Sequence, residues 1–118
     1  MEPSFIYEAK GRTLVIHLPR ELDHHNCRNL KYETDLLMAE NYISRILFDF
    51  TGTEFMDSSG IGVIIGRSRK MGYFGGEVYA EHLSGRILKI FKVSGLHTLI
   101  RTSVPKQQKE REGEKHNA

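Results

Sequence analysis

Residues 55–67 read FMDSSGIGVIIGR, a stretch in which an acid, two serines and a glycine stand directly before an apolar run. Its isoleucines recur at the spacing of one helix face. The first N–H groups of a helix have no partner inside it, and the aligned peptide dipoles place partial positive charge there. The stretch therefore predicts a helix from about Ser58 to Met71, with Asp57 or Ser58 as its cap.

Three glycines interrupt this predicted helix. Each glycine in a helix interior lowers the stability of the helix by about 1 kcal/mol relative to alanine. Three glycines in one helix therefore suggest a structural or functional requirement for them. Gly62 and Gly66 are four residues apart and share one face, away from the isoleucine stripe. A face without side chains lets another backbone approach closely. We therefore expect a docking surface there, with Arg67 at its far end.

Apolar runs before this stretch predict a hairpin and a parallel strand pair. Residues 4–9 and 13–18 are rich in β-branched and aromatic residues and are separated by a glycine turn, which predicts an opening hairpin. Residues 23–40 have helical apolar spacing, and residues 45–50 form the short apolar run of a buried strand. A strand, a helix and a strand form a βαβ unit, so strands 13–18 and 45–50 should be parallel.

The remaining apolar segments complete an α/β pattern. Residues 77–80 are typical of a short strand, and residues 84–95 of a helix capped by Ser84 and ended by Gly95. Residues 96–102 are ambiguous between a short helix and an edge strand. We expect an α/β fold in which a small mixed β-sheet of about four strands is flanked by about four helices, with the hairpin first and the βαβ unit after it.

Composition points to one ordinary domain. The 118 residues are 39% hydrophobic and 27% charged, and the net charge of +2 is too small to indicate nucleic-acid binding. The single cysteine, Cys27, fits a reducing compartment. No signal peptide or membrane-spanning run is visible, so we expect a cytoplasmic protein. Residues 1–104 should form the domain, and residues 105–118, without large apolar residues, a solvated and disordered tail.

No pattern of catalytic or metal-binding residues stands out. His24 and His25 are adjacent and cannot share a helix face, and no cysteine or acid follows at the spacing of zinc ligands. The G-x-S-x-G spacing of a hydrolase nucleophile is absent, because Met56 stands at the first glycine position. We therefore expect no enzyme activity, no cofactor and no metal.

The serine pair has two interpretations. On this stretch alone, a simple helix cap is the stronger one, because such residues begin many helices. The glycine face and the second serine favour a functional site over a simple cap. A phosphoryl group on a serine at a helix start is well tolerated, because its oxygens accept hydrogen bonds from the free N–H groups. The fold could then stay unchanged while the surface gains nearly two negative charges.

Several segments together resemble a known family. They are ELDHH at 21–25, FMDSSGIGVIIGR at 55–67, GGEV at 75–78 and FKVSGL at 91–96. The chain resembles the bacterial anti-sigma factor antagonists of the STAS domain family over roughly residues 4–102, and most closely the sporulation antagonists of spore-forming Firmicutes. The resemblance implies a STAS-like fold, which agrees with the pattern above.

The resemblance also implies a partner-switching function. Members bind an anti-sigma factor that is also a serine kinase with a GHKL-type ATP site, and the unphosphorylated antagonist displaces the sigma factor. The kinase would phosphorylate Ser58, and a metal-dependent serine phosphatase would restore the active form. No contact with nucleic acid or membrane is implied. The residues expected to contact the partner are Asp23, Asp57, Ser59, Gly62, Gly66 and Arg67.

Two alternatives stay open at this point. The domain could serve another stress or biofilm pathway through a different kinase, with the same phosphoserine logic. It could instead be a STAS domain that binds a nucleotide or metabolite, with the helix start at Ser58 holding a ligand phosphate. No glycine-rich loop followed by a lysine supports that second alternative.

Overall fold

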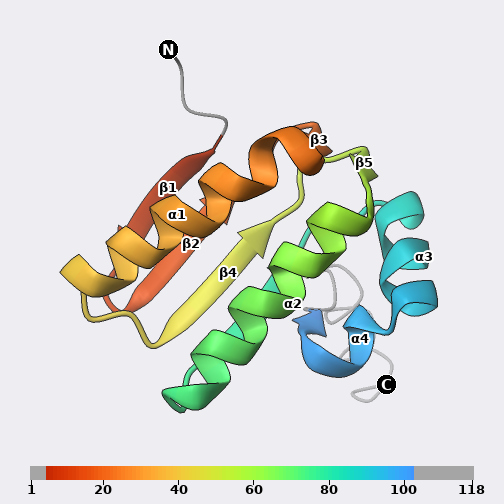
Figure 1. The fold of residues 1–118 in the computed structure, drawn as a ribbon. Coiled ribbons are helices and arrows are strands. Elements are labelled where there is room, and N and C mark those ends of the chain that lie inside the picture. Colours follow the sequence, from red (N-terminus) through yellow and green to blue (C-terminus); the bar gives the residue numbers. More distant parts are fainter. Residues whose placement is uncertain (1–4, 103–118) are drawn as a thin grey trace, which may run out of the picture.

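A five-stranded mixed sheet lies at the centre of the fold (Figure 1). The computed structural model of the chain describes residues 5–102. Within them the strand order is β1-β2-β4-β6-β7, with β1 antiparallel to β2 and every other neighbouring pair parallel. The strands are β1 (Ile6–Lys10), β2 (Thr13–His17), β4 (Arg45–Asp49), β6 (Glu77–Glu81) and β7 (Arg101–Thr102).

Two long helices lie side by side across one face of this sheet, and two shorter ones pack near its β7 edge (Figure 1). They are α1 (His24–Glu40), α2 (Ser58–Tyr73), α3 (Gly85–Ser94) and α4 (Leu96–Leu99). A separate two-stranded sheet pairs β3 (Glu21–Leu22) with β5 (Phe55–Met56). It connects the main sheet to the starts of α1 and α2.

The predicted hairpin and βαβ unit are confirmed. Leu14 pairs with Ile46 in the parallel β2–β4 register, and the hairpin turn holds Gly11 at a φ of 61°. The segment at 96–102 turns out to contain both of its alternatives, since α4 is followed directly by β7. That last short strand raises the main sheet from the expected four strands to five.

The alternation of side chains along the strands separates the two faces of the sheet. Residues such as Ile16, Phe48 and Ala80 are fully buried and form the core with the helices. On α1, the predicted stripe is confirmed, with Cys27 and Leu30 buried in that same core. The opposite face of the sheet carries polar residues, including a row of charged and titratable side chains at the end of the strands.

Two details of the helices differ from expectation. Helix α2 runs to Tyr73, two residues beyond the predicted Met71. On α3, the apolar pattern predicts Ile87, Leu88 and Phe91 on the inner face. Ile87 and Phe91 are buried there, whereas Leu88 is 36% exposed. Among residues 5–102, the structure contains no helix of the length and apolar character that crossing a membrane requires. The expected tail at 105–118 lies outside the described residues.

Gly60 is required by packing inside the domain. A Cβ atom at this position would lie 2.5 Å from the Leu22 carbonyl oxygen and 2.7 Å from Cγ of Met56. A Cβ atom at Gly62 would meet no neighbouring heavy atom of residues 5–102 within 4 Å. Gly60 is therefore needed so that the start of α2 can lie close to β3. Packing inside the domain does not require Gly62.

This difference predicts opposite effects on stability. We expect Gly60→Ala to lower the free energy of unfolding by about 1–3 kcal/mol, because a backbone oxygen cannot move away cheaply. Gly62→Ala should raise it by up to about 1 kcal/mol through helix propensity. Urea unfolding followed by circular dichroism measures both. Equal effects of the two substitutions would contradict the packing described here.

Candidate functional site

The parallel pairing of β3 with β5 places the starts of α1 and α2 next to each other. Leu22 is paired with Met56, and the N–H of Asp57 donates to the Leu22 carbonyl at 3.2 Å. Asp23 and Asp57 are therefore the next residues on two adjacent parallel strands. Each is the N-cap of the helix that follows. Asp23 and Asp57, both expected at the partner surface, therefore lie at the same edge of the domain.

The Asp57 carboxylate connects the two helix starts. Its Oδ1 accepts a hydrogen bond from the N–H of Gly60 at 3.0 Å, which caps α2. Its Oδ2 accepts one from the N–H of His24 at 3.2 Å, at the start of α1. The bond from Gly60, followed by that from His24, holds the pKa of Asp57 below its ordinary value. The carboxylate is therefore ionised at neutral pH and holds the two helix starts next to each other.

Asp23 caps α1 through a reciprocal arrangement with Asn26. The Asp23 carboxylate accepts from the N–H groups of His25 at 3.0 Å and Asn26 at 3.3 Å, and Asn26 Oδ1 accepts from the N–H of Asp23. The buried thiol of Cys27 lies near both acids. Burial first, and then the charges of Asp57 and Asp23, raise the pKa of Cys27 to about 11. Two carboxylates thus share one small region of surface.

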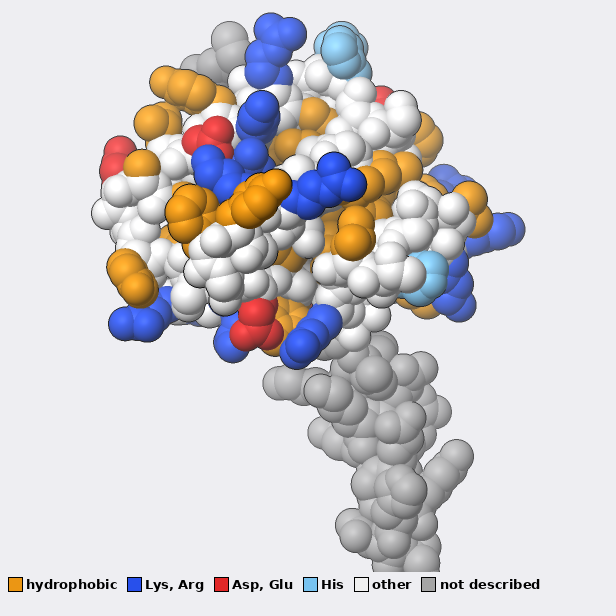
Figure 2. All heavy atoms as spheres, turned by 60° about the horizontal axis from the view of Figure 1, so that its bottom comes forward, with side chains coloured by type: hydrophobic (Ala, Val, Ile, Leu, Met, Phe, Trp, Pro, Cys, Tyr) orange, Lys and Arg blue, Asp and Glu red, His pale blue; other side chains and the backbone are white. Residues whose placement is uncertain are grey.

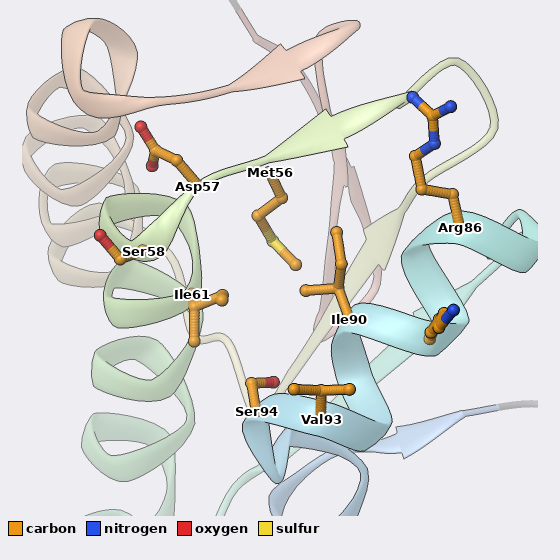
Figure 3. A pocket seen from close by; sticks show the side chains of 9 residues that line it. Met56, Asp57, Ser58, Ile61, Arg86, Ile90, Val93 and Ser94 are labelled. Carbon is orange, nitrogen blue, oxygen red and sulfur yellow. The ribbon is translucent and has the colours of Figure 1, made fainter.

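Ser58 is the first residue of α2, and its side chain is exposed. In Figure 3 its hydroxyl points away from α3, on the same side of the helix start as Asp57. Ser59 follows and is half-buried. A second molecule can therefore reach the Ser58 oxygen without any rearrangement of the domain.

An open groove of about 420 Å³ lies between the start of α2 and helix α3 (Figure 3). Its floor is apolar, and cations project from the α3 wall opposite the acid and serine of α2. Val93 on its rim is 82% exposed. The residues that line it are Met56, Asp57, Ser58, Ile61, Arg86, Lys89, Ile90, Val93 and Ser94.

The contribution of α3 to this groove was not predicted from the sequence. Its signal was present, because Arg86, Ile90 and Val93 are spaced by four and three residues and share a face of the helix that does not contain the buried Ile87 and Phe91. Lys89 lies on that same face. An apolar residue on an exposed helix face is common in itself. This face becomes a candidate binding surface only because the fold places α3 beside Ser58.

Gly62 and Gly66 lie on an open face of α2, as expected. Beyond the backbone of α2 itself, an added Cβ atom at either position would meet no heavy atom of the described residues within 4 Å. Gly62 is exposed and Gly66 is half-buried. The surface that begins at Ser58 therefore continues along α2 as a strip where an approaching backbone meets no side chain.

Arg67 is buried, which corrects the expectation that it reaches a partner. Its side chain is only 5% exposed, and Nη1 donates to Thr34 Oγ1 at 3.2 Å and Asp35 Oδ1 at 2.5 Å. Lys70 Nζ donates to the same Asp35 oxygen at 2.6 Å. The positions 60, 64, 67 and 71 form the buried stripe of α2, so Arg67 joins α2 to α1.

A second hollow, of about 450 Å³, lies at the other end of α2. Two aromatic side chains, Tyr42 and Phe74, line it, and each is 76% exposed. This end of the molecule comes forward in Figure 2, where hydrophobic side chains lie among Lys and Arg. Helix α2 separates this hollow from Ser58 by its whole length. In the part of the chain that the structure describes, no cluster of three or more His, Cys, Asp or Glu residues could hold a metal ion.

Comparison with known proteins identifies relatives of this chain. A family model described as the STAS domain matches residues 4–109. The anti-sigma F factor antagonist of Lysinibacillus sphaericus is 33% identical over 84 residues, which cover 71% of this chain and 72% of that protein. The fold is similar to the unphosphorylated anti-sigma factor antagonist SpoIIAA, with a TM-score of 0.76 and 30% identity over 91% of this chain and 94% of that one.

The same relative has a second solved state. The Bacillus cell fate determinant SpoIIAA in its phosphorylated form matches with a TM-score of 0.69 and 30% identity, over 91% of this chain and 97% of that one. The fold of this chain is thus similar to both forms.

The burial of Arg67 predicts a structural role. Arg67→Ala should lower the free energy of unfolding by on the order of 2 kcal/mol, less than for a fully buried pair because Asp35 is partly exposed. Arg69→Ala, on the exposed side of the same helix, should change it by less than about 0.5 kcal/mol. Thermal unfolding of the two variants makes the comparison, and similar effects would mean that Arg67 does not join the helices.

Proposed function

The chain belongs to the STAS domain family, and from this premise we propose that it is an anti-sigma factor antagonist controlled by phosphorylation of Ser58. The relatives that carry this name support the first part of the proposal. The observation that carries the second part is the exposed Ser58 hydroxyl at the first turn of α2, between two capping carboxylates and an open groove.

In this proposal the partner is an anti-sigma factor that is also a serine kinase with a GHKL-type ATP site. The unphosphorylated protein binds it and releases the sigma factor. The kinase transfers a phosphoryl group to Ser58, and a serine phosphatase later removes it. The existence of a relative in an unphosphorylated and a phosphorylated form supports such a cycle. The protein is then the substrate of the kinase and has no catalytic role of its own.

Electrostatics explains how one phosphoryl group would end binding. It adds nearly two negative charges beside Asp57 and Asp23, both within the same small region. The helix start tolerates these charges, because free N–H groups and the peptide dipole face them. A partner that covers the site must instead remove them from water, which costs several kcal/mol without matching cations. The switch therefore acts at the interface and leaves the fold unchanged.

The docking surface follows from the geometry around Ser58. It comprises the groove between α2 and α3 and the open strip at Gly62 and Gly66. Asp23, Asp57 and Ser59 lie at its edge, and we no longer include Arg67. The cations Arg86 and Lys89 on the α3 wall favour acidic groups on the partner opposite them. A cytoplasmic location, expected from the sequence, stays a prediction.

The first test identifies the modified residue. The protein is mixed with the anti-sigma factor serine kinase of its own organism and ATP, and phosphate is located by mass spectrometry. We expect modification of the wild type and of Ser59→Ala, and none of Ser58→Ala. Ser58→Asp should lose most of its binding to the kinase, because it carries a negative charge at the same place.

Two outcomes would contradict the assignment. Phosphate found chiefly on Ser59 would show that Ser58 is not the residue that the kinase modifies. Ser58→Asp that binds as well as the wild type would remove the electrostatic basis of the switch. A nucleotide-binding function would show itself differently, as tight binding of ATP or GTP by the protein alone in equilibrium dialysis.

The second test concerns the open strip on α2. Gly62→Leu should weaken binding of the kinase at least tenfold, a loss of about 1.4 kcal/mol, by keeping the partner backbone away. Gly72→Leu is the matched control, because its added side chain also meets open space but lies at the far end of the helix. Calorimetric titration measures both affinities. Unfolding of Gly62→Leu, or equal affinities of the two variants, would show that the strip is not a docking surface.

A further inference from the structure

A cluster of titratable side chains lies on the sheet face opposite to α1 and α2. Asp49, at the end of β4, has a side chain that is only 15% exposed. Its Oδ2 lies 2.7 Å from His17 Nδ1 on β2, and its Oδ1 lies 3.0 Å from His82 Nδ1, just after β6. Thr51 donates to Oδ1 from its N–H at 3.0 Å and from its hydroxyl at 2.5 Å. One carboxylate thus joins β2, β4 and the segment after β6.

The contacts of His17 require a protonated ring. Its Nε2 lies 2.5 Å from Glu8 Oε1 on β1, while Nδ1 faces Asp49. An ionised carboxylate only accepts hydrogen bonds, and a neutral imidazole donates from one nitrogen only. Both contacts can therefore exist together only in the imidazolium form. The geometry of the cluster therefore depends on the second ring proton of His17.

Other charges face the cluster from each neighbouring strand. Lys10 Nζ lies 3.8 Å from Glu8 Oε2 on β1. Glu81 on β6 stands beside Asp49 in the parallel register. With His17 protonated, a cation lies between Glu8 and Asp49. After it loses the proton, one of its two carboxylate contacts must break, and the acids on β1, β4 and β6 face one another without it.

The directions of the pKa shifts agree with this geometry. The bond with Glu8, and then that with Asp49, raise the pKa of His17. Burial alone would raise the pKa of Asp49, but bonds from Thr51, His17 and His82 outweigh it and lower that pKa to about 2. The stabilisation from His17 is complete below its unfolded pKa of about 6.5 and is lost as pH rises through the raised value. That from Asp49 is complete above about pH 4 and is lost as pH falls toward about 2.

His82 connects this cluster to the groove. It has a φ of 61°, the left-handed region that few non-glycine residues adopt, and its ring is held by Asp49. Ser84, two residues later, caps α3, which carries the Arg86 and Lys89 wall of the groove. Asp49 thus provides a hydrogen bond to the strained residue at the start of this short segment.

We propose that His17, Asp49 and His82 form a pH-sensitive latch that holds the segment between β6 and α3. Protonated His17 keeps Asp49 in place, and Asp49 keeps His82 in its left-handed conformation. Loss of the His17 proton removes the cation between Glu8 and Asp49, weakens the hold on the Asp49 carboxylate and loosens residues 82–90. The α3 wall of the groove is then held less firmly in alkaline than in mildly acidic solution.

NMR titration of the whole chain tests the latch. The His17 ring signals give the pH at which its proton is lost, and the amide signals of residues 82–90 should shift with the same midpoint. Glu8→Gln, at an exposed position, should lower both midpoints together, because it removes the largest cause of the raised His17 pKa. His25→Gln is the control and should leave both midpoints unchanged.

The outcomes separate a latch from local titration. In His17→Gln the corresponding shift of the 82–90 amides should disappear. His82→Asn, which tolerates the left-handed conformation, should reduce that shift while the His17 ring still titrates. If Glu8→Gln moves the His17 midpoint and the amides do not follow, the latch does not exist. Amides of 82–90 that stay still throughout the wild-type titration would overturn it equally.

Discussion

The close pairing of β3 with β5 is the constraint on which the rest of the site depends. Two residues on each strand are enough, because Gly60 lets α2 begin against the Leu22 carbonyl and Asp57 bonds to both helix starts. Two helix N-termini, which both favour negative charge, thus lie side by side with a carboxylate on each. Ser58 is exposed as a direct result, since it is the first residue beyond this junction.

In this arrangement, a charge added at Ser58 lies apart from the buried contacts that stabilise the fold. The buried contacts of α2, including the Arg67 pair with Asp35, lie on the side that faces the sheet and α1. The Ser58 hydroxyl, the open glycine strip and the groove lie on the outer surface of the domain. A phosphoryl group can therefore change what the surface binds without disturbing the packing. The proposed latch acts on the other wall of the same groove, through the segment that begins at His82.

Strong periodic signals made much of the fold predictable. Helix α1, the opening hairpin and the start of α2 at Ser58 follow from apolar spacing and capping residues. The strands β3 and β5 could not be found in this way, because a two-residue strand has no period. Arg67 was misplaced because its charge suggested exposure, although its spacing from Ile64 and Met71 marks the buried face. The contribution of α3 to the site depended on tertiary placement, which local patterns do not encode.

The proposed switch requires that a charge on Ser58 changes what the domain binds while the fold stays the same. Comparison of the amide NMR spectra of the free and the Ser58-phosphorylated protein tests it most directly. Chemical-shift changes should be confined to the starts of α1 and α2 and to the groove beside them, with the core signals of the sheet unmoved. Widespread shifts through the sheet and the buried face of α2 would show that phosphorylation refolds the domain, and would contradict the account.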